Sequence, residues 1–487
     1  MIQLGLSAFY HDSAAALVID GKVICAIEEE KLSGEKHDSS FPFKAIQWCL
    51  EYAKITIDEV DMVCWYENPK DKFERVRETI GKWGGLRFPM KWRQFLKRWN
   101  QSEGNLKGIL KSIGYDGEIL YSLHHHSHLA LSYYTSPFDK AIGLSIDGVG
   151  ESHTIYAAMC DELGFHKIQT LHFPHSLGLI YSAFTAYLGF KPNEGEYKVM
   201  GLAPYGDNQK YNNIFDKVVT TGGEIDIVKM DMSYFTWHTS DNDMFNDKLI
   251  DLIGFPPRFK DEPIEQHHKD LAASLQQWYE GALYFIINRI TNSWECENLV
   301  LGGGCAYNGL ANGKITIETP YKNVYVPPAP SDAGSAIGCA LFVYYQSNPT
   351  QKRVENSNPF LGPSYVAADF ITAIAKLVPK DKVKRFENYN PLIEKVAELI
   401  NDGAIIGWFQ DGSEFGQRAL GHRSILANPT IKDIKPKVNR VIKKREGFRP
   451  FAPMVTADDA NKYFEMLGQE VPYMNQVVKV TDYKSIP

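Results

Sequence analysis

Three features are missing from this sequence: cysteine pairs spaced as CxxC, an apolar run long enough to span a bilayer, and an excess of positive charge. The seven cysteines are scattered and odd in number, which favours reduced thiols and argues against a cysteine zinc site. The first residues lack the basic region of a signal peptide. A net charge of -7 gives no general attraction to nucleic acid or anionic lipid. We therefore expect a cytoplasmic protein with neither a membrane nor a nucleic-acid partner.

The chain is too long for one ordinary hydrophobic core. Its 487 residues are 44% hydrophobic and 23% charged, which is typical of a soluble globular enzyme. This length indicates roughly two to four domains or subdomains. A stretch rich in Asn, Pro and Ser at 346–358 is the clearest linker. It predicts a large domain at 1–345 and a smaller one at 359–487.

Four histidines lie within five positions in the stretch LHHHSHLA. On a helix, His124 and His128 lie one turn apart on the same face, so both rings can reach one cation. Asp147 and Asp332 each follow an apolar run and adjoin glycines, which is typical of a strand end that turns toward a ligand. Two imidazoles with two carboxylates suit iron, manganese or zinc. For the short HxxxH pattern alone, a histidine-rich surface turn is the alternative.

The first thirty residues predict three strands, at 3–10, 13–21 and 22–30. The loop between the first two carries His11, Asp12 and Ser13, which suits close approach of a phosphate or hydroxyl, or an ordinary turn. The later stretch LSIDGVGESHTIYA repeats this order of apolar strand, polar loop and second strand. Such an internal repeat indicates duplicated halves that face a central cleft.

A buried-strand pattern followed by three glycines begins at residue 298. The glycines, which include Gly303 and Gly304, let a nucleotide lie against bare backbone, although the P-loop lysine and the dinucleotide spacing are both missing. Upstream, Glu196 and Lys198 bracket a tyrosine. On a strand they would share a face and orient a substrate or a metal-bound water. A surface ion pair is the alternative for that tripeptide.

Two basic stretches stand out from the acidic whole. Residues 70–100 interleave aromatic and basic side chains, and we interpret them as an amphipathic helical pair rather than a substrate cover or a nucleic-acid face. Residues 418–449 hold ten Lys or Arg against Asp433 and Glu446. Such density is typical of a polyphosphate site, with a solvated basic helix as the alternative.

Together these motifs resemble the O-carbamoyltransferases of antibiotic and nodulation-factor biosynthesis. The resemblance runs almost from end to end, through HDSAAALVIDG, HHHSHLA, IDGVGE, GEYKVMGLAPYG, GGGCAYNG, SDAGSAIG, EFGQRALGHRSILANP and KKREGFRPFAP. It implies an α/β chain with a duplicated actin-like ATPase fold, similar to the threonylcarbamoyl transferases. A smaller α/β YrdC-like domain that makes carbamoyl-adenylate would follow.

The resemblance also implies the chemistry and its residues. ATP and carbamoyl phosphate would give carbamoyl-adenylate, from which the carbamoyl group passes to a hydroxyl of a small molecule. His11 would be the base. This role also suits a histidine on general grounds, because the ordinary pKa of an imidazole lies near neutrality. The remaining implied roles are an iron-type or other divalent metal on His124, His128, Asp147 and Asp332; the nucleotide on Gly303, Gly304, Asn308, Glu196 and Lys198; and carbamoyl phosphate with ATP on Arg418, Lys443 and Arg449. Mg²⁺ is an optional further cofactor to which no residue is assigned.

The chain departs from the family pattern in two places. Family members continue past this chain's last residue with the motifs HVDGTAR and NTSFN, so we expect the adenylating domain to be truncated. Asp411 replaces a residue that is usually basic, which would weaken phosphate binding locally. Both departures bear on the first half-reaction more than on the second.

Two other functions are alternatives. Threonylcarbamoyl transfer to tRNA is less favoured because the large domain has no sustained basic stripe. A non-catalytic actin-like ATP-binding regulator would not need four converging metal ligands. The sequence names neither the acceptor nor the metal, and it leaves a homodimer as one possible assembly. We expect acceptor specificity to lie in loops such as 65–105 and 225–265.

Overall fold

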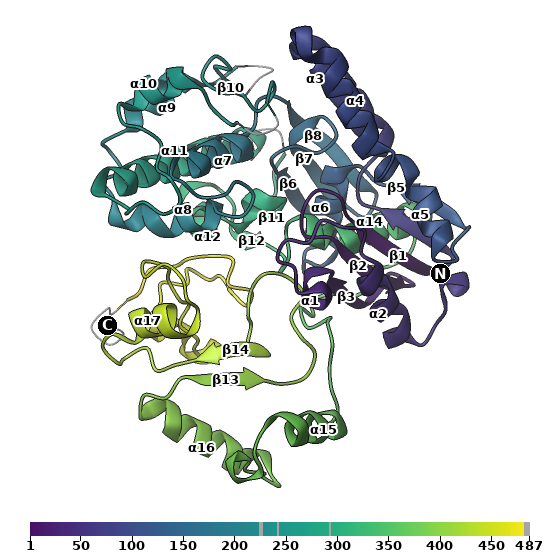
Figure 1. The fold of residues 1–487 in the computed structure, drawn as a ribbon, viewed down its shortest axis with the longest axis vertical. Coiled ribbons are helices and arrows are strands. Elements are labelled where there is room, and N and C mark those ends of the chain that lie inside the picture. The colour runs from purple at the N-terminus through teal and green to yellow at the C-terminus, as the bar shows by residue number, and fades with distance from the viewer. Residues whose placement is uncertain (224–226, 241–242, 292–293, 482–487) are drawn as a thin grey trace. The chain divides into compact units, whose positions relative to one another are not determined.

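The computed structural model describes residues 1–223, 227–240, 243–291 and 294–481, and these form two compact units (Figure 1). Unit 1 comprises Met1–Ser357 together with the short segment Asn475–Val477. Unit 2 comprises Asn358–Met474 and the described residues 478–481. Within unit 1, the Arg353 guanidinium donates to the carbonyl of Ser136 at 2.7 Å, and the Asn356 amide donates to the carbonyl of Gly21 at 2.9 Å. This part of the expected linker is therefore fixed to unit 1.

The first sheet of unit 1 has the strand order β3-β2-β1-β4-β5. Strand β1 pairs antiparallel with β2 and parallel with β4, while β2 pairs antiparallel with β3 and β4 parallel with β5. The three N-terminal strands predicted from the sequence are all present. The strands are β1 (Ile2–Ser7), β2 (Ala14–Ile19), β3 (Lys22–Glu28), β4 (Met62–Trp65) and β5 (Glu118–Tyr121).

The second sheet repeats this arrangement with the order β12-β11-β6-β7-β8. Strand β6 takes the place of β1, pairing antiparallel with β7 and parallel with β11. This topology is that of the duplicated actin-like fold, and it confirms the internal repeat predicted from LSIDGVGESHTIYA. The strands are β6 (Ala141–Ile146), β7 (His153–Asp161), β8 (Gly164–His172), β11 (Asn298–Gly302) and β12 (Asn323–Tyr325).

Two helices, α6 (His124–Tyr134) and α14 (Asp332–Ser347), pack closely against each other. Small residues on α14 allow the approach, because a Cβ on Gly338 would lie 1.9 Å from the Ser127 carbonyl oxygen of α6. A Cβ on Gly5 of β1 would likewise lie 1.8 Å from the Ala336 carbonyl oxygen of α14. The backbone contacts therefore fix α6, α14 and β1 relative to one another.

We expect Gly338→Ala to destabilise unit 1 by about 1–3 kcal/mol, because the added methyl overlaps backbone that cannot move without shifting α6. Denaturant unfolding would measure the loss. The matched control is Gly281→Ala in the interior of α11, where an added Cβ meets no atom within 4 Å. That change should stabilise the protein by up to about 1 kcal/mol. Equal stability of the two variants would contradict a tight α6–α14 contact.

The remaining helices of unit 1 surround the two sheets. They are α1 (Glu30–Ser33), α2 (Phe43–Ala53), α3 (Pro69–Trp83), α4 (Phe88–Trp99), α5 (Leu106–Ser112), α7 (Leu177–Tyr187), α8 (Glu196–Leu202), α9 (Asn212–Val218), α10 (Asp247–Ile253), α11 (Gln266–Thr291), α12 (Gly309–Asn312) and α13 (Ile315–Glu318). A short ribbon joins β9 (Val219–Thr221) to β10 (Val228–Met230).

The aromatic stretch at 70–100 forms the helical pair that the sequence predicts. Phe73 of α3 contacts Trp92, Phe95 and Trp99 of α4 at ring distances of 5.3–5.5 Å. No residue of either helix is fully buried, however. The pair is therefore an arm beside the core rather than part of it, and Figure 1 shows α3 and α4 as the elongated element at the upper right.

Unit 2 is a smaller α/β unit. Its strands β13 (Ile406–Phe409) and β14 (Arg423–Leu426) form an antiparallel pair, and its helices are α15 (Ala367–Leu377), α16 (Tyr389–Asn401), α17 (Ile434–Lys437) and α18 (Ala460–Tyr463). The Arg423 guanidinium stacks 3.5 Å from the centroid of the Phe409 ring across this pair. Across both units, no helix among the described residues combines the length and apolar character needed to cross a membrane.

Candidate functional site

The two histidines and two aspartates singled out in the sequence converge at one point in unit 1. One ligand atom from each of His124, His128, Asp147 and Asp332 lies within 4.8 Å of all the others. The Nε2 atoms of the two histidines are 3.0 Å apart. Asp147 Oδ2 lies 3.0 Å from His128 Nε2 and 3.4 Å from His124 Nε2, and Asp332 Oδ1 lies 3.5 and 3.7 Å from the same two atoms.

These spacings fit a divalent cation. Ligand atoms about 2.0–2.2 Å from one metal are themselves separated by about 3 Å. His128 is fully buried, and His124 and Asp332 are nearly so. His128 Nδ1 is hydrogen-bonded to the Ser335 hydroxyl at 3.1 Å, which orients the ring as outer-shell partners of metal ligands do. The residues present therefore suit the divalent metal that the sequence predicts.

Three local structures bring these ligands together. His124 is the first residue of α6, and its backbone N–H donates to the Glu151 carboxylate at 2.8 Å. Asp147 follows strand β6, as its sequence pattern predicts. Asp332 does not end a strand, which corrects that expectation: it is the first residue of helix α14. The site thus lies where α6 and α14 begin.

Without a cation, the cluster carries opposed charges. Burial alone would lower the pKa of His124, but the carboxylates of Asp332 and Asp147 raise it to about 9. Burial would raise the pKa of Asp147, whereas hydrogen bonds from His124 and His128 hold it well below its usual value. Metal binding would replace the proton on His124.

The other two histidines of the LHHHSHLA stretch have structural roles. His125 Nδ1 is hydrogen-bonded to the Ser145 hydroxyl at 2.7 Å, and its Nε2 to the His153 carbonyl at 2.9 Å. His126 packs edge-on against the Tyr156 ring at 4.9 Å. The HxxxH spacing therefore distinguishes the pair that faces the site from the pair that does not.

His11 lies beside this cluster of two histidines and two aspartates, on the loop between β1 and β2. Its Nδ1 is 3.0 Å from Asp12 Oδ2, and its Nε2 is 3.8 Å from Asp332 Oδ2. Asp12 also pairs with His37 Nδ1 at 2.7 Å. Burial alone would lower the pKa of His11, but Asp332 and Asp12 raise it to about 9. A bound cation would offset the charge of Asp332 and so favour the neutral ring.

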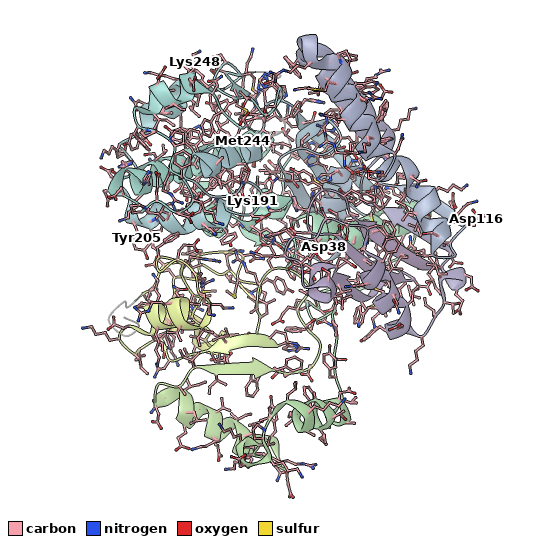
Figure 2. All side chains as sticks on the ribbon, in the orientation of Figure 1. Asp38, Asp116, Lys191, Tyr205, Met244 and Lys248 are labelled. Carbon is pink, nitrogen blue, oxygen red and sulfur yellow. The ribbon has the colours of Figure 1, made fainter. Side chains whose placement is uncertain are left out.

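His37 is a residue that the sequence reasoning missed. It lies next to Asp38, which is labelled in Figure 2, on a segment that pairs with the His11 loop through the bond from the Ser13 N–H to the Asp38 carbonyl at 2.9 Å. Nothing in the local sequence connects it to His11. Only the folded loop shows that His37 anchors Asp12, which in turn orients His11.

The triple-glycine turn adjoins the same cluster. The Gly304 N–H donates to Asp147 Oδ2 at 3.3 Å. Gly303 has a φ of 86°, and a Cβ there would lie 2.1 Å from the Ile146 carbonyl oxygen, so both conformation and space require glycine. The Asn308 side chain exchanges two hydrogen bonds with Gln276 of α11, at 2.9 and 3.0 Å, and also caps α12. Gln276 is a second residue that the sequence reasoning missed.

Glu196 and Lys198 lie on helix α8, which corrects the expectation that they share the face of a strand. Two residues apart on a helix, they point in different directions. The Glu196 carboxylate accepts from the Ser182 hydroxyl at 2.6 Å and from the Asn193 N–H at 2.8 Å, so it stabilises the start of α8. The Lys198 ammonium lies 5.6 Å from the centroid of the Phe190 ring.

In unit 2, part of the basic segment at 418–449 forms a cluster. Burial and the positive charges of Arg445 and Arg449 lower the pKa of Lys443. Arg449 lies 3.7 Å from Glu446, and Arg445 donates to Asn439 at 2.6 Å. Arg418 is half-buried.

A single carboxylate organises the loop that carries Arg418. Glu414 accepts from the backbone N–H groups of Leu420, His422 and Arg423 at 2.7–3.2 Å. The Arg423 guanidinium is held by backbone carbonyls, including that of Pro363 at 2.8 Å. Arg423 therefore supports the fold, although it belongs to the basic segment counted from the sequence.

Comparisons with known proteins agree with this architecture. The family models described as "Carbamoyltransferase N-terminus" and "Carbamoyltransferase C-terminus" match residues 2–341 and 397–486. An uncharacterized protein of Synechocystis is 40% identical over 99% of this chain and 80% of its own length. Nodulation protein NolNO of Sinorhizobium fredii is 33% identical over 98% of this chain and 67% of its own length. Nodulation protein U of Bradyrhizobium diazoefficiens is 26% identical over 95% of this chain and 80% of its own length.

Both parts of the chain match the same kind of enzyme. The N-terminal family model covers unit 1 almost completely and includes His11 and all four residues of the histidine–aspartate cluster. The C-terminal model includes Arg418, Lys443 and Arg449. The resemblance inferred from the motifs is thereby confirmed, and the chain belongs to the carbamoyltransferase family.

Proposed function

We propose that this protein is an ATP-dependent O-carbamoyltransferase. Carbamoyl phosphate and ATP would react to carbamoyl-adenylate, and the carbamoyl group would then pass to a hydroxyl of a small-molecule acceptor. The observation that carries the proposal is the convergence of His11 with four metal-ligand side chains in a chain of the carbamoyltransferase family.

His11 would act as the base in the transfer step. With Nδ1 donating to Asp12, its Nε2 is left as the proton acceptor and faces the cluster. The acceptor oxygen forms a bond to the carbamoyl carbon as the bond from that carbon to the adenylate phosphate oxygen breaks. The hydroxyl proton passes to His11 Nε2, and AMP departs with the electron pair.

His124, His128, Asp147 and Asp332 would hold the metal, an iron-type or other divalent ion. When bound, it supplies positive charge against the charge that develops on the departing phosphate. The Gly304 N–H and the Gln276–Asn308 pair lie on the glycine-rich side of the cluster and would meet the nucleotide. The cluster of Lys443, Arg445 and Arg449 would bind carbamoyl phosphate and the ATP phosphates in unit 2.

We expect pyrophosphate release to require both ATP and carbamoyl phosphate. Arg449→Gln should lower this release about 10- to 100-fold, because a charge-assisted bond to phosphate contributes about 1.5–3 kcal/mol. The matched control is Arg440→Gln, an exposed arginine of the same basic segment, which should stay within about twofold of wild type. An enzyme-coupled pyrophosphate assay on the full chain would measure both.

Two results would contradict the proposal. Pyrophosphate release from ATP alone would indicate a different activation chemistry. Mass spectrometry would show which acceptor is carbamoylated. If tRNA is carbamoylated and hydroxylated small molecules are not, the result would favour transfer of the threonylcarbamoyl type.

A further inference from the structure

A cavity of about 260 Å³ in unit 1 has no assigned role. Its walls come from the helical arm α3–α4, from the segment around Phe173 and Leu179, and from residues 237–240. The arm is joined to the opposite wall by the Lys91 ammonium, which donates to the Thr239 carbonyl. Residues 241–242 of this expected specificity region lie outside the described part of the chain.

The cavity lies next to the proposed catalytic cluster. Val149, which lines it, is two residues from Asp147 on the same loop. Arg75, another lining residue, donates through Nε to the Glu151 carbonyl at 2.8 Å. The Glu151 carboxylate accepts from the His124 N–H at 2.8 Å. The loop 147–151 therefore separates the cavity from the metal cluster and contributes to both.

The charge of the cavity has one sign. Arg75, Lys91 and Arg98 line it, and no Asp or Glu is among its described lining residues. Arg75 is half-buried, and within the described part of the chain it forms no ion pair. Its Nε bond to Glu151 leaves the two terminal amino groups as a fork suited to a carboxylate or phosphate.

The remaining walls are aromatic. Trp83 lies edge-on to Phe173, with ring centroids 6.4 Å apart, and to His238, at 5.1 Å. Trp237 donates through Nε1 to the Pro174 carbonyl at 3.0 Å, which fixes its ring. His238 Nδ1 is buried and has no hydrogen-bond partner among the described residues. Flat apolar walls with one available polar atom suit a ring that carries hydroxyls.

We infer that this cavity binds the acceptor of the carbamoyl group, and that the acceptor is a hydroxylated ring compound bearing an anionic group. The anionic group pairs with Arg75 and Lys91, the ring packs against Trp83 and Trp237, and a hydroxyl reaches toward the loop 147–151. This inference rests on the proposed function, which supplies the need for an acceptor. The anionic group is a carboxylate or a phosphate, since both match the guanidinium fork.

Binding of a matched series would test the inference. Para-nitrophenyl glucuronide, glucoside and glucosaminide carry the same ring and differ in charge, and the glucoside phosphorylated on its primary hydroxyl adds a phosphate arm. We expect the full chain to bind the glucuronide or the phosphate at least about tenfold more tightly than the neutral and cationic compounds in calorimetric titrations. Whichever of the two anionic compounds binds more tightly identifies the anionic group as a carboxylate or a phosphate.

Variants connect this preference to the cavity. Arg75→Gln and, separately, Lys91→Gln should each reduce the anionic preference about tenfold. Arg77→Gln is the control, because Arg77 lies on the same helix, is exposed, pairs with Glu74 and is not a lining residue. Near-ultraviolet circular dichroism identifies any variant that fails to fold.

Equal binding of the neutral or cationic compound, or an anionic preference unchanged in both well-folded cavity variants, would overturn the inference. The proposed function is tested separately by pyrophosphate release from wild-type protein. Selective anion binding without that release would contradict the proposed function and leave the cavity assignment in place.

Discussion

Replacing His128 by Ala is expected to remove the bound metal and to lower carbamoyl transfer by about 1,000-fold or more, since a lost cation removes several kcal/mol of charge stabilisation. The ring is fully buried, and its Nε2 faces all three of the other ligands. Elemental analysis of the purified variant would measure the metal. Asp332→Asn, which preserves shape and removes charge, should give the same result.

The control for this experiment is His166→Ala, an exposed histidine that pairs with Asp161 away from the cluster. It should retain metal and activity. Full metal content in both His128→Ala and Asp332→Asn would show that these side chains do not hold the ion.

The same site predicts how metal binding depends on pH. Since the pKa of metal-free His124 is raised to about 9, the imidazole is protonated at neutral pH and must release its proton when metal binds. The apparent affinity should therefore rise as the pH increases toward about 9 and fall in more acidic solution. His128→Ala protein, which should bind no metal, gives the baseline for these titrations.

The second large effect concerns His11. His11→Gln should lower carbamoyl transfer about 10²- to 10⁴-fold, the usual contribution of a positioned general base. Pyrophosphate formation in a single turnover should continue, because the cationic cluster assigned to that step belongs to unit 2. Transfer would be followed by mass spectrometry of the acceptor, and activation by a rapid-quench measurement of pyrophosphate.

His37→Gln provides a graded comparison. Because His37 acts through Asp12, its loss should lower transfer by about tenfold rather than remove it. Wild-type transfer rates in His11→Gln would contradict its role as the base. An equally large effect on both half-reactions would instead indicate a general structural defect.

Much of the fold and part of the site could be predicted because their signals are local. The HxxxH spacing fixes which histidines share a helix face. The repeated strand–loop–strand pattern places Asp147 in the loop of the second half that corresponds to the His11 loop of the first. These predictions depend on patterns within a few neighbouring residues, and long-range packing does not change them.

The errors have a different cause. Glu196 and Lys198 could not be placed correctly because an EYK tripeptide has no period of its own, and three backbone and side-chain bonds to Glu196 start a helix there. Asp332 looked like a strand end because small residues follow it. Those same small residues, among them Gly338, instead allow α14 to approach α6.

The residues that were missed act over long range. His37 reaches Asp12 only after the loop at 37–39 folds back, and Gln276 reaches Asn308 from a separate helix. Arg75 gains its significance from Glu151 and from the cavity that the helical arm encloses. No local pattern marks such partners, since each depends on tertiary packing.

The start of α14 has a consequence for how the enzyme is made. Three of the four proposed metal ligands emerge early from the ribosome, whereas Asp332 emerges only after the whole second sheet has been translated. At roughly 5–20 residues per second, nascent chains carry an incomplete ligand set for roughly ten seconds or more. We therefore expect metal loading to follow translation of the second sheet, and we expect cells starved of metal to accumulate full-length apoprotein rather than arrested fragments.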